Sequence, residues 1–197
     1  MGAKKPPTLD NARDYYHGKA AARYEEQRTG KAKWRVEQRH FEAAIKEVRG
    51  GKVLDVPVGT GRFLEWYRHC GLEVVGVDYS NAMLAIARAA HPWAALEQGD
   101  VAALRFGDGE FDAVVCARLL HLVATHEVAP IMRELFRVAK SHVILTTYLD
   151  AKPYVSGRSQ VHVYNDAVWS QPGWPPARPQ LLLKSKGVPY YMLHYSR

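Results

Sequence analysis

The chain has 197 residues, of which 47% are hydrophobic and 24% charged, and this size and composition indicate one globular domain with a sizeable core. Its net charge of +7 would suit nucleic acid or a phospholipid surface, but the excess is dispersed and several basic residues lie near the N-terminus. Two isolated cysteines, Cys70 and Cys116, exclude a disulfide framework, and the lack of a membrane-length apolar run or signal peptide predicts a cytoplasmic protein without a transmembrane segment.

Two helices are expected before residue 50. The first covers about residues 11–28. The second covers residues 34–48, in which Trp34, Phe41 and Ile45 fall on one face at helical spacing, and it ends at a pair of glycines.

From residue 52 onward, short apolar strands alternate with helices. We expect strands at 52–56, 72–78, 95–97, 111–117 and 141–149, and helices at 62–70, 80–90 and 127–139, with Ser80 as an N-cap. This alternation predicts a parallel sheet with helices on both faces.

The last part of the chain is less regular. Residues 150–179 are rich in Pro, Gly and aromatic side chains, and only "NDAVW" at 165–169 suggests a short helix. Residues 180–196 predict two strands around Lys186-Gly187, an antiparallel hairpin. The whole is interpreted as a single domain with a helical cap at 1–50, a ligand-binding core at 51–150 and a C-terminal part at 151–197.

Three carboxylates fall at successive strand ends. Asp55 ends the first strand, Asp78 ends the second, and Asp100 follows the third. Each alone could cap a helix or form an Asx turn. In an open α/β sheet, however, ligands bind beyond the carboxyl ends of the strands, and the loop after Asp55 contains Gly59 and Gly61. Together these features predict one shared ligand.

The residue types limit the chemistry of that ligand. The stretch "GTGRFL" resembles the start of a dinucleotide-binding GxGxxG loop, but Leu64 stands at the third glycine position. Asp55 would repel a pyrophosphate and attract an ammonium or sulfonium group. Asp78 is well placed for the vicinal hydroxyls of a ribose. A nucleoside with a cationic tail is therefore the expected ligand, and a nicotinamide cofactor is a distant alternative.

Four stretches carry a resemblance to a known family: "VLDVPVGTGRF", "VVGVDYSNAML", "QGDVAALRFGDGEFDAVVCARLLHLV" and "RVAKSHVILTTY". They resemble the successive motifs of class I S-adenosylmethionine-dependent methyltransferases, and more narrowly the methyltransferase type 11 (UbiE-like) branch. The resemblance covers about residues 52–148. It implies a Rossmann-like, mostly parallel sheet with a C-terminal antiparallel hairpin, S-adenosylmethionine as cofactor and S-adenosylhomocysteine as product.

The resemblance also implies roles for individual residues. Those assigned to the methionine part are Asp55, Pro57, Gly59, Thr60 and Gly61, and those assigned to the nucleoside are Asp78, Tyr79, Met83, Asp100 and Val101. Ala117 and Arg118 are expected at the methionine end and the acceptor entrance. The stretch "YYHGKAAARYEEQR" is similar to the pre-sheet helix of the family and would bring Tyr16, Tyr24 and Arg28 over the cofactor. A plain amphipathic helix explains that stretch nearly as well.

Two departures from the family pattern stand out. The branch usually has glycine where Pro57 stands; proline lacks an N–H donor but fixes φ, which could pre-set the loop. Residues 150–179 match neither the long helix nor the strand that the family has after the fifth strand.

Methyl transfer needs a base only if the acceptor must lose a proton. His121 is the best-placed candidate, but a packing role is the favoured interpretation, and Tyr24 and Arg118 are more consistent with positioning. The nine histidines show no ligand spacing, so no metal is expected.

The favoured function is methyl transfer to a small-molecule or lipid-like acceptor, at oxygen, nitrogen or carbon. Alternatives are an RNA or protein methyltransferase, supported only by the +7 charge, and a non-catalytic cofactor-binding protein. The acceptor and the oligomeric state are left open by the sequence.

Overall fold

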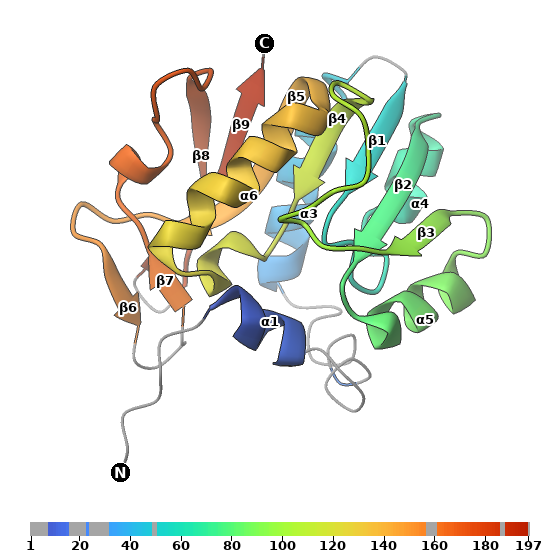
Figure 1. Cartoon of the computed structure of the whole chain (residues 1–197), viewed down its shortest axis with the longest axis horizontal. Helices are drawn as coiled ribbons and strands as arrows, with labels where there is room; N and C mark the ends of the chain where they lie inside the picture. The colour runs from blue at the N-terminus through green and yellow to red at the C-terminus, as the bar shows by residue number, and fades with distance from the viewer. Residues whose placement is uncertain are drawn as a thin grey trace.

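The core of the computed structural model is one sheet of seven strands in the order β3–β2–β1–β4–β5–β9–β8 (Figure 1). The structure describes residues 8–15, 23, 32–48, 51–156, 161–185 and 188–196. The first five strands in chain order pair in parallel, β9 runs antiparallel to β5, and β8 runs antiparallel to β9. The expected parallel sheet with a C-terminal antiparallel hairpin is confirmed. The strands are β1 (Lys52–Asp55), β2 (Glu73–Asp78), β3 (Ala95–Gln98), β4 (Phe111–Cys116), β5 (Ala139–Tyr148), β8 (Ala177–Ser185) and β9 (Val188–Ser196).

The central strands are buried on both faces, because helices cover both. In β4, Ala113 and Val115 join the apolar cluster that includes α3 (Ala32–Ile45) and α4 (Leu64–His69). Val114 and Cys116 join the opposite cluster, which includes α6 (Thr125–Val138). Successive strand residues point to opposite faces, so a continuous apolar run is what a sheet covered on both sides requires. Figure 1 shows α6 in front of the sheet and α3 behind it.

The helices lie close to their expected positions. α5 (Asn81–Ala90) begins after Ser80, whose Oγ accepts the Met83 N–H over 3.3 Å, so the expected N-cap is confirmed. α1 (Leu9–Tyr15) is the described part of the first expected helix; apart from residue 23, the rest of that helix lies outside the described residues. No helix within the described ranges combines the length and apolarity needed to cross a bilayer.

The segment 150–179 contains more regular structure than expected. β6 (Tyr154–Ser156) and β7 (Val161–Val163) form a small antiparallel pair, and η2 (Asp166–Val168) is the short helix expected there. β8 begins at Ala177, so the prediction of an irregular chain up to Pro179 is wrong. The reason is that β8 is the outermost strand of the sheet, where proline is tolerated because one side of the strand needs no donor.

The small β6–β7 pair lies against the loop that follows β4. That loop contains η1 (Leu120–Leu122), and the Tyr164 hydroxyl donates to the Leu120 carbonyl over 2.8 Å. The aromatic ring of Tyr164 also packs edge-on against Trp169. The C-terminal part of the chain thereby fixes a loop at the carboxyl end of the sheet.

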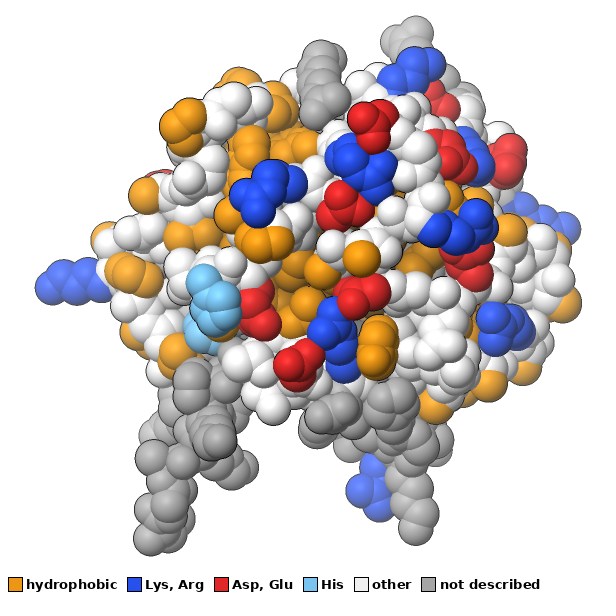
Figure 2. Space-filling model, viewed as in Figure 1, with side chains coloured by type: hydrophobic (Ala, Val, Ile, Leu, Met, Phe, Trp, Pro, Cys, Tyr) orange, Lys and Arg blue, Asp and Glu red, His pale blue; other side chains and the backbone are white. Residues whose placement is uncertain are grey.

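Charged side chains are interspersed over the surface seen in Figure 2. On that face, Lys and Arg side chains lie between Asp and Glu side chains rather than in one basic patch. The net charge of +7 is therefore not concentrated on this face.

Candidate functional site

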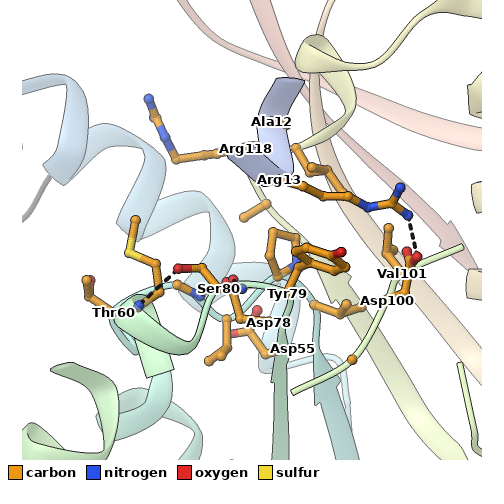
Figure 3. A pocket seen from close by; sticks show the side chains of 18 of the residues that line it. Ala12, Arg13, Asp55, Thr60, Asp78, Tyr79, Ser80, Asp100, Val101 and Arg118 are labelled. Carbon is orange, nitrogen blue, oxygen red and sulfur yellow. Dashed lines mark hydrogen bonds and ion pairs between the residues drawn. The ribbon is translucent and has the colours of Figure 1, made fainter. Parts of the chain in front are cut away.

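A cavity with about 920 Å³ of empty space, part of it open to solvent, lies beyond the carboxyl ends of β1, β2 and β4 (Figure 3). α1 covers it from above, with Leu9, Ala12 and Arg13 in its lining. The residues expected at the site that line this cavity are Asp55, Pro57, Gly59, Thr60, Asp78, Tyr79, Met83, Asp100, Val101, Ala117 and Arg118.

The loop after β1 forms one wall. The Val56–Pro57 peptide is cis, and Gly59 has a φ of +57°, in the left-handed region that favours glycine. A Cβ at Gly59 would meet no atom within 4 Å, so the cavity is open beside it. Gly61 is not in the lining; a Cβ there would come within 2.8 Å of His91 and Leu64, so its small size serves packing.

Asp55 lies at the base of this wall and is 1% exposed. The Tyr67 hydroxyl donates to its carboxylate over 3.2 Å. Burial raises the pKa of Asp55 to about 8 despite that hydrogen bond, and the negative charge of Asp78 adds to the rise. A carboxyl group with this pKa is poised to release its proton when a cation approaches.

Asp78 holds the loop and the start of α5 together. One carboxylate oxygen accepts the Gly59 N–H over 2.8 Å, and the other accepts the Ser80 N–H over 2.8 Å. A carboxylate oxygen is an acceptor for hydroxyl groups, and Asp78 lies in the lining of the cavity.

Asp100 and Tyr79 form the far end of the cavity. One oxygen of Asp100 accepts the Ala102 N–H over 3.0 Å, and the other is paired with the Arg13 guanidinium. The Arg13 guanidinium also lies 5.1 Å from the centre of the Tyr79 ring. In Figure 3, Arg13 reaches down from α1 to Asp100 beside the Tyr79 ring.

A buried group of charged side chains closes the side of the cavity opposite Asp100 and Tyr79. Glu37 of α3 is fully buried and accepts Arg118 Nη1 over 3.0 Å, Arg62 Nη1 over 2.5 Å and the Tyr190 hydroxyl over 2.8 Å. Burial raises the pKa of Glu37, but the charges of Arg118 and Arg62 outweigh it and bring the pKa below its ordinary value. Arg62 and Arg118 both line the cavity.

Sequence reasoning missed Glu37, Arg62, Arg13 and Tyr190. Glu37 had a visible signal, because it follows Trp34 by three residues and precedes Phe41 by four, on the apolar face of its helix. An acid on such a face needs a buried cationic partner.

His121 lies outside the cavity lining. Its ring is buried and packs edge-on against Tyr148 and Tyr190, at centroid distances of 5.4 and 6.3 Å. Tyr16, Tyr24 and Arg28 lie outside the described residues. Within the described ranges, no cluster of His, Cys, Asp and Glu has the arrangement of a metal site.

Residues 53–142 match a protein family described as "Methyltransferase domain". A demethylmenaquinone methyltransferase of Renibacterium salmoninarum is 39% identical over 97 residues, which are 49% of this chain and 40% of that protein. A phosphatidylethanolamine N-methyltransferase of Cereibacter sphaeroides is 39% identical over 104 residues, 50% of each chain. The chain thus spans half or less of the length of these relatives.

Two solved structures cover the chain from end to end. The magnesium protoporphyrin IX methyltransferase from Synechocystis PCC 6803, with bound S-adenosylmethionine, aligns with a TM-score of 0.73 at 18% identity, covering 100% of both chains. The [4+2]-cyclase SpnF aligns with a TM-score of 0.76 at 15% identity, covering 100% of this chain and 99% of its own. At these identities the likeness concerns the fold alone, and the fold serves more than one reaction.

Proposed function

We propose that this chain, which belongs to the class I S-adenosylmethionine-dependent methyltransferases, transfers a methyl group from S-adenosylmethionine to a small-molecule or lipid-like acceptor. The observation that carries the proposal is one cavity lined by three carboxylates, Asp55, Asp78 and Asp100, at successive strand ends. The names of the two relatives refer to demethylmenaquinone and phosphatidylethanolamine. Both compounds are acceptors of the class proposed for this chain.

The lining residues fit such a cofactor. Asp55 would lie beside the cationic methionine part, where the open space next to Gly59 leaves room for a bulky group. The Asp78 carboxylate would accept the two ribose hydroxyls. Tyr79 and Met83 would flank the adenine, and Asp100 would accept its amino group beside the Val101 backbone.

The cofactor supplies an activated methyl group on a sulfonium. The work left to the chain is to hold both partners in line and to exclude water. Leu9 and Ala12 of α1 are buried and close the cavity from one side, which fits them to exclude water. Arg118 and Ala117, directly after β4, are suited to position the acceptor.

Calorimetric titration with S-adenosylhomocysteine and S-adenosylmethionine tests the proposal. Asp78→Ala should weaken both affinities by about 1–3 kcal/mol, the scale of losing charge-assisted hydrogen bonds. Asp108→Ala, an exposed acid outside the cavity, is the matched control and should bind normally. Unchanged affinity in Asp78→Ala would contradict the ribose assignment, and tighter binding of NAD than of S-adenosylhomocysteine would contradict the cofactor.

The RNA or protein methyltransferase alternative is not favoured by the relatives above. The interspersed charges of Figure 2 give it no support on that face. The RNA methyltransferase alternative predicts nucleic-acid binding that weakens steeply with salt.

We also propose a cytoplasmic location for this chain.

A further inference from the structure

Tyr67 is a residue of α4 that reaches the candidate site through one contact. Its side chain is fully buried in the apolar cluster that includes α3 and α4. Its hydroxyl donates over 3.2 Å to Oδ2 of Asp55, which ends β1 and lines the cavity. Tyr67 itself is not among the described residues that line the cavity, so it can act on a ligand there only through Asp55.

The surroundings of Asp55 do little to stabilise a negative charge. Among the described residues, its hydrogen-bond donor is Tyr67 alone and no ion pair holds it. Arg62 lies near enough to favour the charge, but the Arg62 guanidinium donates to three groups of α3 instead. The negative charge of Asp78 opposes ionisation. A buried carboxyl group in such surroundings keeps its proton unless a cation joins it.

Two further titratable groups near Asp55 stay neutral. Burial and the charge of Asp55 raise the phenol pKa of Tyr67 well above its ordinary value. The same two causes raise the pKa of the Cys116 thiol in β4. Tyr67 is therefore a neutral donor, and a hydrogen bond to a carboxylate favours its ionised form. Such a donor makes the ionisation of Asp55 easier, yet leaves it dependent on a cation in the cavity.

We infer that Tyr67 is a positioning residue, and that its hydrogen bond to Asp55 makes the site prefer the sulfonium of S-adenosylmethionine to the neutral sulfur of S-adenosylhomocysteine. This inference rests on the proposed function. With a sulfonium beside it, Asp55 releases its carboxyl proton to solvent, and Tyr67 holds the resulting carboxylate. When the bond between sulfur and the methyl carbon breaks, its electron pair stays on sulfur and the positive charge is gone. Asp55 then takes a proton back from solvent, so the attraction that held the ligand is lost.

The test measures the affinities of the whole chain for S-adenosylmethionine and S-adenosylhomocysteine by calorimetry, on both sides of the pKa of Asp55. In wild type, the preference for S-adenosylmethionine should grow with pH and level off above about 8. Tyr67→Phe removes the donor to the carboxylate. The preference at neutral pH should then fall about tenfold and should level off about one pH unit higher, the scale of losing a hydrogen bond to a charged group.

Tyr195→Phe is the matched control. Tyr195 is also buried, and its hydroxyl donates over 3.1 Å to the Trp169 carbonyl, outside the described lining of the cavity. This variant should lose stability in urea unfolding but keep the preference and the pH dependence of wild type. A similar fall in preference in both variants would overturn the inference, because it would report a general loosening of the fold.

Two further variants keep the test open if Tyr67→Phe does not fold. Replacement of Tyr67 by 3-fluorotyrosine keeps the ring and the hydroxyl but makes the phenol a stronger donor, because fluorine withdraws electrons. The pH dependence should then shift to lower pH, opposite to the shift for Tyr67→Phe. In an Asp55→Asn background, neither change at Tyr67 should alter the preference, since no ionisable group is left for the hydroxyl to act on.

Other outcomes would also overturn the inference while the proposed function stands. One is an unchanged preference and pH dependence in the Tyr67 variants. Another is an equal shift for both ligands, because Asp55 would then face the ammonium group that the two ligands share. A third is an effect of Tyr67→Phe that persists in the Asp55→Asn background. Failure of wild type to bind S-adenosylmethionine or S-adenosylhomocysteine would overturn the proposed function itself.

Discussion

The Arg13 guanidinium is ion-paired with the carboxylate of Asp100 at one end of the cavity. Arg13 belongs to α1 and Asp100 follows β3, so this pair joins the covering helix to the sheet. The oxygen that Arg13 occupies is one of two on Asp100, and the other already accepts the Ala102 N–H. An adenine amino group that binds Asp100 must therefore share or displace Arg13.

We expect Arg13→Gln to bind S-adenosylhomocysteine up to about fivefold more tightly than wild type, because partly exposed ion pairs contribute about 0–1 kcal/mol. Stopped-flow titration should place the gain in the association rate, since the competing cation is removed. Arg105→Gln loses a comparable ion pair outside the cavity and is the control. Weaker binding by Arg13→Gln would mean that Arg13 clamps the adenine instead of competing with it.

Asp55 should make stability and cofactor binding depend on pH in opposite senses. Its pKa is about 8 in the folded chain against an ordinary value of 3.8, so between these values the folded chain binds the extra proton. The contribution of Asp55 to the free energy of unfolding therefore falls as pH rises from about 4 to 8. Asp55→Asn should be more stable than wild type at pH 8 by at least about 1 kcal/mol in urea unfolding.

The same substitution should impair cofactor binding. A cationic sulfonium favours the ionised form of Asp55, so S-adenosylmethionine should bind wild type more tightly as pH approaches 8 and should release a proton on binding. Asp55→Asn should lose this pH dependence, while the affinity for the neutral thioether S-adenosylhomocysteine changes less. Calorimetry in buffers of different ionisation enthalpy measures the proton release. A stability gain without loss of S-adenosylmethionine affinity would argue against a role for Asp55 at the sulfonium.

Gly59 and Gly71 allow a matched test of the loop. Both have positive φ, +57° and +70°, and a Cβ at either would meet no atom within 4 Å. Alanine at either position should cost roughly 1 kcal/mol of unfolding free energy. Only Gly59 lines the cavity, so only Gly59→Ala should also weaken S-adenosylhomocysteine binding, by about tenfold for a methyl group placed in a filled site. Equal affinities in the two variants would remove the loop from the cofactor site.

His121 is predicted to support the structure and not the chemistry. His121→Asn should lower the free energy of unfolding by about 1–3 kcal/mol, because it removes a buried ring packed edge-on against Tyr148 and Tyr190. The affinity for S-adenosylhomocysteine should change by less than about twofold, and the pH profile of methyl transfer should be unchanged. Loss of the acidic limb of that profile, where protonation of a base lowers the rate, would restore His121 as the general base.

The strand-end acids show why much of the site could be predicted from sequence. Asp55 and Asp78 end apolar runs, and parallel strands bring their carboxyl ends to one edge, so the alternation of strands and helices was sufficient to group them. Both line the observed cavity. The prediction needed only local patterns and one topological rule.

The contacts that depend on distant pairing could not be predicted in this way. Arg118 and Glu37 are 81 residues apart, and Tyr190 and Glu37 are 153 residues apart. Their contact depends on how α3 packs behind the sheet and on where β9 pairs. The first residues of β8, Ala177–Pro179, were missed for a related reason, because a proline is acceptable in a strand only at the edge of a sheet.

The contacts of Glu37 limit which segments of the chain can be replaced by the corresponding segments of a relative. Its carboxylate extends from α3 and accepts hydrogen bonds from Arg62 in the loop after β1, from Arg118 in the loop after β4 and from Tyr190 of β9. A chimera that takes residues 150–196 from a relative would bring a foreign side chain to the Tyr190 position and leave a buried carboxylate short of a donor. The C-terminal hairpin of a relative should therefore be accepted by this chain only when α3 is exchanged together with it.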